Sequence, residues 1–436
     1  MRTTVSDPSP TLLMPAGGAA CPNTADGRTT ARMMPHTIRA TCDVVIPARN
    51  AEPYIAAAIQ SLVNQSHRAS RIIVVDDRST DRTVEAAKVF GRSVQIVEGA
   101  GRGSGSARNL GVRHSDSDLI AFLDADDICH PDRLRLQIDA LGRHPEASMA
   151  FCDAEFTDPV GRLAGPAFTC PEFRREVFLG QLFERNRILT TSVAVVRRSS
   201  FDAVGGFDEN LSPAEEYDLW LRLAGAGQVE HVAQALVWYR LHDGNVSRNL
   251  EALRACERDT LEKHGMSNIR AALQAAYADP AQADMALSGV LFRMERYDEG
   301  ETLLRGIVPR VPDRALRHFV LGNFAVQRGE LAVAAAEYGL SLACDPAFAP
   351  SHNNLGVIAE AEGRRRHSLQ HLIRAAELRP GYSDPKRNLE LLRGRRGSEL
   401  RYTLVPLRAV LRPEQREVSP SGLAGISLTP PQELAS

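Results

Sequence analysis

The hydrophobic pattern of the chain changes character near residue 250. Between residues 41 and 250, short apolar runs alternate with stretches of helical spacing, whereas from about residue 250 to 395 the spacing is helical throughout. Short apolar runs bounded by turn residues favour buried strands, and apolar residues three and four positions apart favour helices. The pattern therefore predicts an α/β domain followed by an all-α region.

The α/β region begins with four strand-like runs. They lie at residues 43–47, 71–75, 94–97 and 119–123, and later runs at 148–152, 192–196 and 235–239 are also expected to form strands. Residues 55–63 have helical spacing between the first two runs. Alternating strands and helices predict a mainly parallel sheet covered on both faces, and in such sheets ligands collect at the carboxyl ends of the strands.

The all-α region carries a sequence period of 34 residues. Gly322 and Gly356 are one period apart, and Gly329 and Gly363 lie seven residues beyond them. The same period is visible in Leu287, Leu321, Leu355 and Leu389 and in Pro312, Pro346 and Pro380. This register resembles the tetratricopeptide repeat (TPR), a helix–turn–helix unit of the same length.

The TPR resemblance implies three repeats, at 283–314, 315–348 and 349–382, and a capping helix that contains Leu389. The first repeat departs from the pattern because Ser288 and Glu295 stand at its glycine positions, and an ordinary helical bundle is the alternative. The chain as a whole divides into a disordered tail at 1–40, the α/β domain at 41–250, a helical linker at 251–282, the repeats with their cap at 283–395 and a poorly ordered tail at 396–436.

Composition narrows the classes of function. The formal net charge is −2, which disfavours a protein that binds nucleic acid. The seven cysteines form neither a CxxC motif nor a cluster with zinc spacing, so we interpret them as reduced thiols. No apolar run approaches the roughly 18 residues that span a bilayer. We therefore expect a cytoplasmic location, with the inner face of the membrane as the alternative.

Acidic residues follow two of the predicted strands. Asp76 and Asp77 come directly after the second run, and a DADD turn at 124–127 follows the fourth. Three carboxylates within four residues repel one another unless a cation or hydrogen-bond donors offset their charge. Carboxylate and diphosphate oxygens together are the ligands that Mg²⁺ prefers. Helix capping through Ser79 at the first cluster, and a solvated acidic turn at the second, are the alternatives.

Three further motifs are candidates for chemistry. The glycine-rich loop at 99–109 allows backbone to approach a ligand but matches neither a P-loop nor a dinucleotide fingerprint, and a flexible surface loop is the alternative. Glu215 and Glu216 open a helical stretch, where they either complement the helix dipole or supply a general base. His242 lies in a polar loop after a predicted strand, and a lone histidine is more often structural than functional.

In their order along the chain these motifs resemble glycosyltransferase family 2, whose domains have the GT-A fold. The resemblance covers residues 41–250. It rests on VVIPARN at 44–50, DDRSTD at 76–81, SARNLG at 106–111, DADD at 124–127, EEYDLWLR at 215–222 and YRLH at 239–242.

The family resemblance implies a role for each matched acidic residue on the donor side. Asp77, with Asp76 beside it, would contact the nucleoside, and Pro47 belongs to the same nucleotide site. Asp124 would meet the ribose or a metal ion. Asp126 would bind Mn²⁺ or Mg²⁺ on the diphosphate of the nucleotide-sugar donor.

The resemblance also implies a general base in the EEYD motif. The family usually has aspartate after glutamate at this position, whereas this chain has Glu216, which keeps a carboxylate on a longer arm. Glu216 is the expected base and Glu215 is the alternative.

The function implied is that of an inverting glycosyltransferase of the kind used in polysaccharide biosynthesis. Its acceptor would be a saccharide, a lipid-linked saccharide, a protein or another hydroxyl compound, and the TPR-like repeats would dock the acceptor or a protein partner. A non-catalytic scaffold that carries a degenerate GT-A domain is the alternative. A nucleotidyltransferase is disfavoured because the first strand is not followed by a glycine-rich loop with a lysine.

Overall fold

The computed structural model describes residues 40–404, apart from 166, 213–214, 246–248, 308–313 and 395–399. Of the two expected tails, residues 1–39 and 405–436 lie outside the described residues, and so does Pro312 of the repeat pattern.

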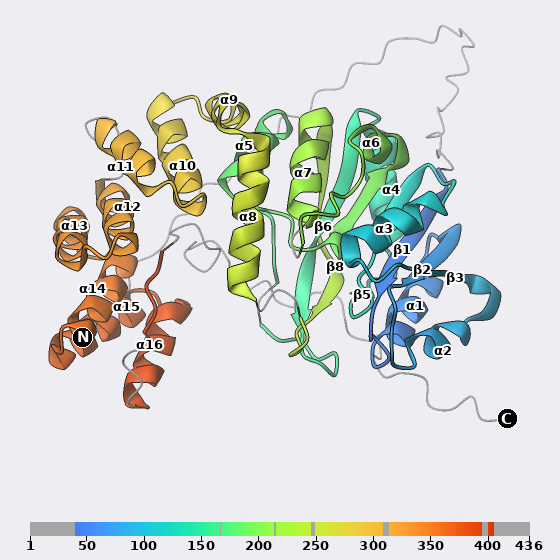
Figure 1. Ribbon diagram of the computed structural model, residues 1–436, viewed down its shortest axis with the longest axis horizontal. Coiled ribbons are helices and arrows are strands. Elements are labelled where there is room, and N and C mark those ends of the chain that lie inside the picture. The colour runs from blue at the N-terminus through green and yellow to red at the C-terminus, as the bar shows by residue number, and fades with distance from the viewer. Residues whose placement is uncertain are drawn as a thin grey trace, which may run out of the picture. The chain divides into compact units, whose positions relative to one another are not determined.

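One eight-stranded sheet organises the first half of the described chain (Figure 1). Along the chain, the strands are β1 Cys42–Ala48, β2 Arg71–Asp76, β3 Val94–Glu98, β4 Leu119–Phe122, β5 Ile128–Cys129, β6 Ala147–Thr157, β7 Ala194–Arg197 and β8 Gln228–Arg240. Within the sheet they lie side by side in the order β3-β2-β1-β4-β7-β6-β8-β5. β1 to β4 are parallel, but β7 is antiparallel to both of its neighbours and β5 is antiparallel to β8. β6 and β8 are parallel as well, so the sheet is mainly parallel, as predicted, with antiparallel pairs where β7 and β5 join it. The apolar pattern did not predict these pairs, because it reports which faces are buried and not the direction of a strand.

Alternate residues of β1 belong to separate hydrophobic cores on the two faces of the sheet. Val44 and Ile46 share one core with residues of α1 Ile55–Val63, α2 Thr83–Lys88 and α4 Arg133–Arg143. Val45 shares the other with residues of α3 Ser104–Arg113, α5 Phe178–Glu184, α6 Arg198–Ala203 and α7 Glu215–Ala226. Burial of each aliphatic side chain stabilises the fold by about 1.5–3 kcal/mol, so covering both faces fixes the strands in place.

The predicted elements of the α/β domain all form, with differences at their ends. α1 has the predicted bounds, and β1, β2 and β3 extend the predicted runs by one or two residues. β6 and β8 are longer than predicted because their outer residues pair with each other through a register shift at Asp153. β5 was not predicted, since two residues carry no period.

The second half of the described chain is helical. Its helices are α8 Leu250–His264, α9 Met266–Ala276, α10 Pro280–Arg293, α11 Tyr297–Gly306, α12 Arg314–Gln327, α13 Leu331–Cys344, α14 Ala349–Ala361, α15 Arg365–Leu378 and α16 Ser383–Arg393. Glu295, Gly329 and Gly363 lie in the turns of the pairs α10–α11, α12–α13 and α14–α15, and all three have positive φ (59°, 77° and 75°). Three equivalent turns one sequence period apart are compatible with a helical solenoid, and the TPR assignment remains a prediction.

The helices expected as a linker are packed on the sheet domain. Leu261 of α8 and Ile269 and Leu273 of α9 are buried in the same core as Val45. A Cβ at Gly180 of α5 would lie 2.3 Å from the carbonyl oxygen of Ala272, so α5 and α9 are in close contact. α8 and α9 therefore contribute side chains to the sheet domain's core, which their periodicity alone did not reveal.

The segment Leu400–Leu404, expected within a poorly ordered tail, packs against the helices instead. Thr403 is buried, and hydrogen bonds from α12, α14 and α16 hold the backbone around it. Side-chain amides of those helices replace the regular secondary structure that the segment lacks.

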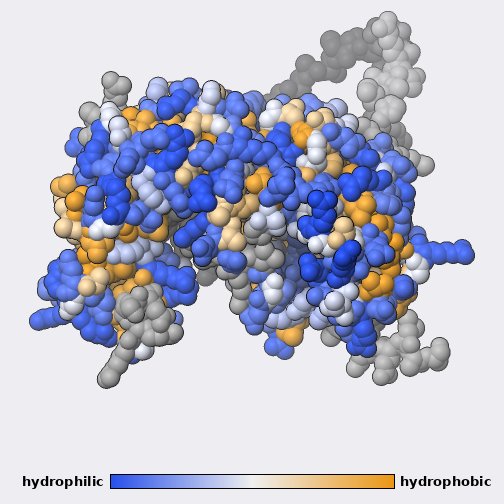
Figure 2. Space-filling model, in the orientation of Figure 1, coloured by the Kyte–Doolittle hydropathy of each residue, from blue (hydrophilic) through white to orange (hydrophobic). Residues whose placement is uncertain are grey.

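Hydrophilic residues cover most of the face seen in Figure 2, and the hydrophobic residues on it are scattered in small groups. Within the described part of the chain, no helix combines the length and the apolar character needed to cross a membrane.

Candidate active site

A pocket of about 630 Å³ lies where β1, β2 and β4 end. A volume of this size suits a nucleotide-sized ligand. Its lining comes from the loop after β1, the end of β2, the start of α3, the turn after β4, the residues before β7, the start of α7 and the segment after β8. These include Pro47, Arg49, Asn50, Tyr54, Asp77, Ser104, Arg108, Asp124, Asp126, Thr190, Thr191, Glu215, Glu216 and His242.

Asp77 holds the glycine-rich loop. Its Oδ1 accepts hydrogen bonds from the backbone N–H groups of Gly101 (2.7 Å) and Arg102 (3.2 Å), and its Oδ2 accepts one from Gly103 (2.8 Å). Gly101 and Gly103 have φ of 75° and 97°, a region that favours glycine. The loop is therefore anchored over the pocket rather than free at the surface.

The rest of the DDRSTD motif ties two loops together. The backbone N–H of Asn50 donates to Ser79 Oγ (3.0 Å), and Asn50 Oδ1 accepts from the N–H of Thr80 (2.8 Å). The backbone N–H of Ser79 donates to Asp76 (3.3 Å), which does not line the pocket. α2 begins only at Thr83, so the proposed capping role of Ser79 is wrong and its hydroxyl joins the loop after β1.

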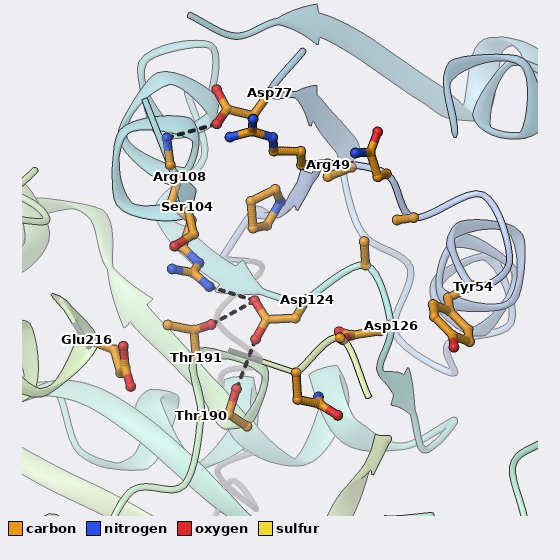
Figure 3. A pocket seen from close by; sticks show the side chains of 18 of the residues that line it. Arg49, Tyr54, Asp77, Ser104, Arg108, Asp124, Asp126, Thr190, Thr191 and Glu216 are labelled. Atoms are coloured by element: carbon orange, nitrogen blue, oxygen red, sulfur yellow. Dashed lines mark hydrogen bonds and ion pairs between the residues drawn. The ribbon is translucent and has the colours of Figure 1, made fainter. Parts of the chain in front are cut away.

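Asp124 is surrounded by hydrogen-bond donors (Figure 3). Its Oδ1 accepts from Arg108 (2.6 Å) and Thr191 Oγ1 (3.0 Å), and its Oδ2 accepts from Thr190 Oγ1 (3.0 Å). Burial alone would raise the pKa of Asp124, but the Arg108 charge and the threonine hydroxyls outweigh it and lower the pKa. Asp124 is therefore held as a carboxylate in a fixed orientation.

Asp126 faces the pocket and contacts His242. The two side chains meet at 2.8 Å, from Asp126 Oδ2 to His242 Nε2, and the imidazole stacks on Tyr54 with ring centroids 4.8 Å apart. Burial and the negative charge of Asp124 raise the pKa of Asp126, and His242 opposes the shift. A cation or proton donor at this position would relieve the repulsion between the two aspartates.

Asp127 connects backbone segments around the pocket. It is buried, its Oδ2 accepts from Ser192 Oγ (2.5 Å), and its Oδ1 accepts from the backbone N–H of Arg240 (3.1 Å). It therefore fastens the turn after β4 to the end of β8 and the start of β7.

Arg108 joins the two acidic clusters. Its guanidinium donates to Asp124 and, at 2.8 Å, to Glu215 Oε1, which also accepts from Ser104 Oγ (2.5 Å). Burial would lower the pKa of Arg108, but the charges of Asp124 and Glu215 raise it. Glu215 Oε2 is buried without a hydrogen-bond partner among the described residues.

Glu216 differs from Glu215 in its surroundings. Among the described side chains none pairs with its carboxylate, and burial and the charge of Glu215 raise its pKa to about 8. In Figure 3, Glu216 lies on one side of Asp124, and Asp126 and Tyr54 lie on the other. A carboxyl group with a raised pKa in a pocket is suited to proton transfer near neutral pH.

The pocket gathers nearly all of the residues singled out in the sequence. The structure brings Pro47, Asp77, Asp124, Asp126, Glu215 and Glu216 to its lining, and leaves Asp76 outside. Sequence reasoning missed Tyr54, Thr190 and Thr191. The two threonines reach Asp124 because β7 is antiparallel to β4, so that its start lies beside the end of β4. The only sequence signal for these threonines is that two polar residues directly precede a predicted strand. Without the direction of that strand, the sequence does not show which end of the sheet they reach.

The side chains of the pocket provide only some of the ligands that a divalent ion needs. No cluster of three His, Cys, Asp or Glu side chains that could hold a metal occurs in the part of the chain that is described. Asp126, with His242 beside it, offers one carboxylate and one imidazole to the pocket. Mg²⁺ commonly takes one or two carboxylates and completes its shell with substrate phosphates and waters, and this arrangement is compatible with such a site.

Comparison with known families locates a match in the sheet domain. Residues 43–205 match the family model Glycosyl transferase family 2. This match supports the resemblance over that segment of the domain. The matched segment includes Asp77, Asp124 and Asp126 and ends before Glu215.

Curated relatives match just under half of the chain. An uncharacterized glycosyltransferase of Rickettsia typhi is 25% identical over 217 residues, which are 49% of this chain and 68% of the relative. Chondroitin synthase of Escherichia coli is 27% identical over 207 residues, 47% of this chain and 29% of the synthase. Hyaluronan synthase of Pasteurella multocida is 27% identical over 207 residues, 47% of this chain and 21% of the synthase. The chain therefore spans less than a third of either synthase.

Two solved structures of one protein show a likeness across a larger share of the chain. S. aureus TarS 1-349 in complex with UDP-GlcNAc has a TM-score of 0.45 and 17% identity, over 77% of this chain and 91% of that chain. S. aureus TarS has a TM-score of 0.44 and 19% identity, over 74% of this chain and 55% of that chain.

Proposed function

We propose that the sheet domain is a GT-A-type glycosyltransferase that moves a sugar from a nucleotide-sugar donor to a hydroxyl acceptor, with inversion at the anomeric carbon. The observation that supports it is the convergence of Asp77, the turn with Asp124 and Asp126, and Glu216 on one pocket, within and beside the segment that matches the family model. Three separate parts of the chain supply these groups.

The donor nucleoside is proposed to lie against the anchored glycine loop and the loop after β1. An ionised carboxylate has about four acceptor sites. The loop N–H groups use three sites of Asp77, two on Oδ1 and one on Oδ2. One site on Oδ2 remains for a donor group of the nucleoside.

Asp126 is proposed to hold Mn²⁺ or Mg²⁺ together with the donor diphosphate, with His242 within reach of the same position. An ion bound there stabilises negative charge on the leaving nucleoside diphosphate. Asp124, whose oxygens are already engaged by Arg108 and two threonines, positions Arg108 and the turn, which leaves Asp126 on the pocket lining to hold the ion.

Glu216 is proposed as the general base that takes the proton of the acceptor hydroxyl. A hydroxyl group is a weak nucleophile at neutral pH, so a carboxylate within hydrogen-bond reach must accept its proton. Arg108 and Ser104 engage Glu215, whereas the Glu216 carboxylate stays available to the pocket. Its position across Asp124 from Asp126 suits attack from the side opposite the leaving group (Figure 3).

The acceptor is proposed to be a saccharide. The similarity to chondroitin synthase and hyaluronan synthase, which are named for polysaccharide products, supports this class over a lipid or protein acceptor. The helical pairs after α10 would then dock an acceptor or a protein partner.

A panel of nucleotide sugars tests the proposal. Each is incubated with the full chain, Mn²⁺ or Mg²⁺ and candidate saccharides, and release of the nucleoside diphosphate is measured. One or a few donors should be turned over, and NMR should show the product linkage inverted relative to the donor. A retained linkage contradicts the single-displacement mechanism. If no nucleotide sugar is turned over, and none binds more tightly than the buffer components do, the result favours the non-catalytic scaffold.

A further inference from the structure

The most informative feature outside the transferase pocket is a row of buried asparagines in the helical half. Asn323 lies on α12, Asn353 and Asn354 on α14, and Asn388 on α16, the first helices of successive pairs or the final helix. All four are buried although asparagine is usually exposed. Buried amides are costly unless their donors and acceptors are paired, so their partners show what the row is built to hold.

Their partners are main-chain groups of the segment Leu400–Leu404, which runs along these helices (Figure 1). Asn388 donates to the carbonyl of Arg401 (2.9 Å) and accepts from its N–H (2.9 Å). Asn354 does the same for Thr403, at 3.0 Å and 2.7 Å. Asn323 donates to the carbonyl of Leu404 (2.8 Å).

Pairing at every second residue is the pattern of an extended chain, in which alternate residues present their N–H and C=O groups to the same side. Asn354 and Asn388 are one sequence period apart. The row of asparagines therefore binds two alternate residues of an extended peptide through the main-chain groups of the peptide. This binding does not depend on the peptide's side chains.

The side chain of Thr403 adds a sequence requirement. Its hydroxyl donates to Asp384 Oδ2 (2.7 Å), accepts from Asn353 Nδ2 (3.2 Å) and meets the hydroxyl of Tyr382. A hydroxyl has one donor and two acceptor sites, so these three contacts use all of them. A valine of similar shape would remove all three of these hydrogen bonds, whereas a serine keeps the hydroxyl that makes them.

We propose that this asparagine groove is a binding site for an extended peptide segment of another protein that carries serine or threonine at the Thr403 position. The segment Leu400–Leu404 fills the groove from within the same chain and acts as a built-in competitor. Access of a partner peptide to the groove is then limited by release of this segment. The proposal is independent of the transferase reaction, because none of these residues lines the transferase pocket.

The test uses a fluorescein-labelled synthetic peptide with the sequence of residues 397–408, whose binding to the full chain is followed by anisotropy. The wild-type chain should bind it weakly because its own segment occupies the groove. Thr403→Val weakens the internal segment, so this chain should bind the threonine-containing peptide roughly tenfold more tightly or better. A peptide with valine at the threonine position should lose that gain on the same chain.

Second variants separate groove binding from loss of folding. Adding Asn388→Ala to Thr403→Val should remove the gain, whereas adding Asn268→Ala, an exposed asparagine of α9, should leave it unchanged. Equal affinity of the two peptides, or equal binding by the wild-type and Thr403→Val chains, overturns the proposal. A concentration-dependent wild-type dimer that Thr403→Val abolishes, seen by sedimentation, would mean that the segment belongs to a second copy and overturns its role as an internal competitor.

Discussion

Adjacent residues of a helix can have unrelated roles, as Glu215 and Glu216 illustrate. Successive residues of an α-helix point about 100° apart. Glu215 is thereby directed at Arg108 and Ser104, where it helps to hold a buried charge network, and Glu216 is directed to open space in the pocket. Burial beside Glu215 then raises the pKa of Glu216 to about 8 and prepares it for proton transfer.

Replacing Glu216 by glutamine should lower transfer by roughly 10²–10⁴, the usual contribution of a positioned base, while donor affinity stays near normal. The base must be ionised to accept a proton, so the wild-type rate should rise as pH passes through about 8, and Glu216→Gln should lose that rise. Steady-state rates and donor affinity measured across pH check both expectations. Glu215→Gln should cost less; a Glu216→Gln enzyme that keeps its activity would remove Glu216 from this role.

Replacing Asp126 by alanine should abolish the metal-dependent part of donor binding, because it removes the pocket-lining carboxylate beside His242. Calorimetric titration of a donor with Mn²⁺ or with EDTA measures this part directly. Asp139→Ala, within α4 and outside the pocket lining, is the matched control and should bind donor like the wild type. Wild-type donor binding that is equally tight in EDTA would contradict a metal at this site.

At the scale of elements, close packing of helix pairs depends on small residues at the contact. A Cβ at Gly322 of α12 would lie 2.5 Å from the ring of Tyr338 on α13, and a Cβ at Gly356 of α14 would lie 2.7 Å from Leu372 on α15. The two glycines are one sequence period apart. Each pair therefore closes by the same contact, which explains why the period is visible in the sequence.

Gly322→Ala should lower the free energy of unfolding by about 1–3 kcal/mol, because the added methyl group forces α12 and α13 apart. Gly339→Ala, on the exposed side of α13 where a Cβ meets nothing within 4 Å, should instead stabilise by about 0.5–1 kcal/mol. Urea unfolding followed by circular dichroism distinguishes the two. Equal effects of the two changes would mean that the contact between these helices is not tight in solution.

At the scale of the whole molecule, the transferase domain ends later than the change in hydrophobic pattern suggests. Asp218 of α7 is buried and paired with Lys263 (3.0 Å) and His264 (3.1 Å) at the end of α8. Burial would raise the pKa of Asp218, but His264, Arg222 and Lys263 outweigh it and lower the pKa. The helices beyond residue 250 are therefore bound to the sheet domain by charge as well as by apolar contact.

A chain that ends at residue 260 should not fold stably, because it loses α9 and two partners of the buried Asp218, Lys263 and His264. A chain that ends at residue 307 keeps α8 to α11 and should fold and turn over donor at a rate near that of the full chain. Solubility, thermal unfolding and donor hydrolysis of the two chains check this. If the 307-residue chain folds but turns over no donor that the full chain uses, the later helices are needed for catalysis.

The sequence by itself was sufficient for the order of elements, the acidic clusters at strand ends and the sequence period of the helices. These features follow from local rules: alternation marks buried faces, apolar spacing marks helices, and a repeated contact requires a repeated residue. Pro47, Asp77, Asp124 and Asp126 could be assigned to one site because parallel strands place their carboxyl ends at one edge of the sheet.

Only the tertiary structure decided which groups complete that site. Strand direction brings Thr190 and Thr191 to Asp124, and the position of α3 brings Arg108 between Asp124 and Glu215. The packing of α8 and α9 on the sheet domain and the docking of Leu400–Leu404 likewise depend on contacts between distant segments. Periodicity shows which side of an element is buried but not which segment packs against that side. In this protein, the packing partner decides whether helices expected as a linker join the core, and whether residues expected in a tail form a docked segment.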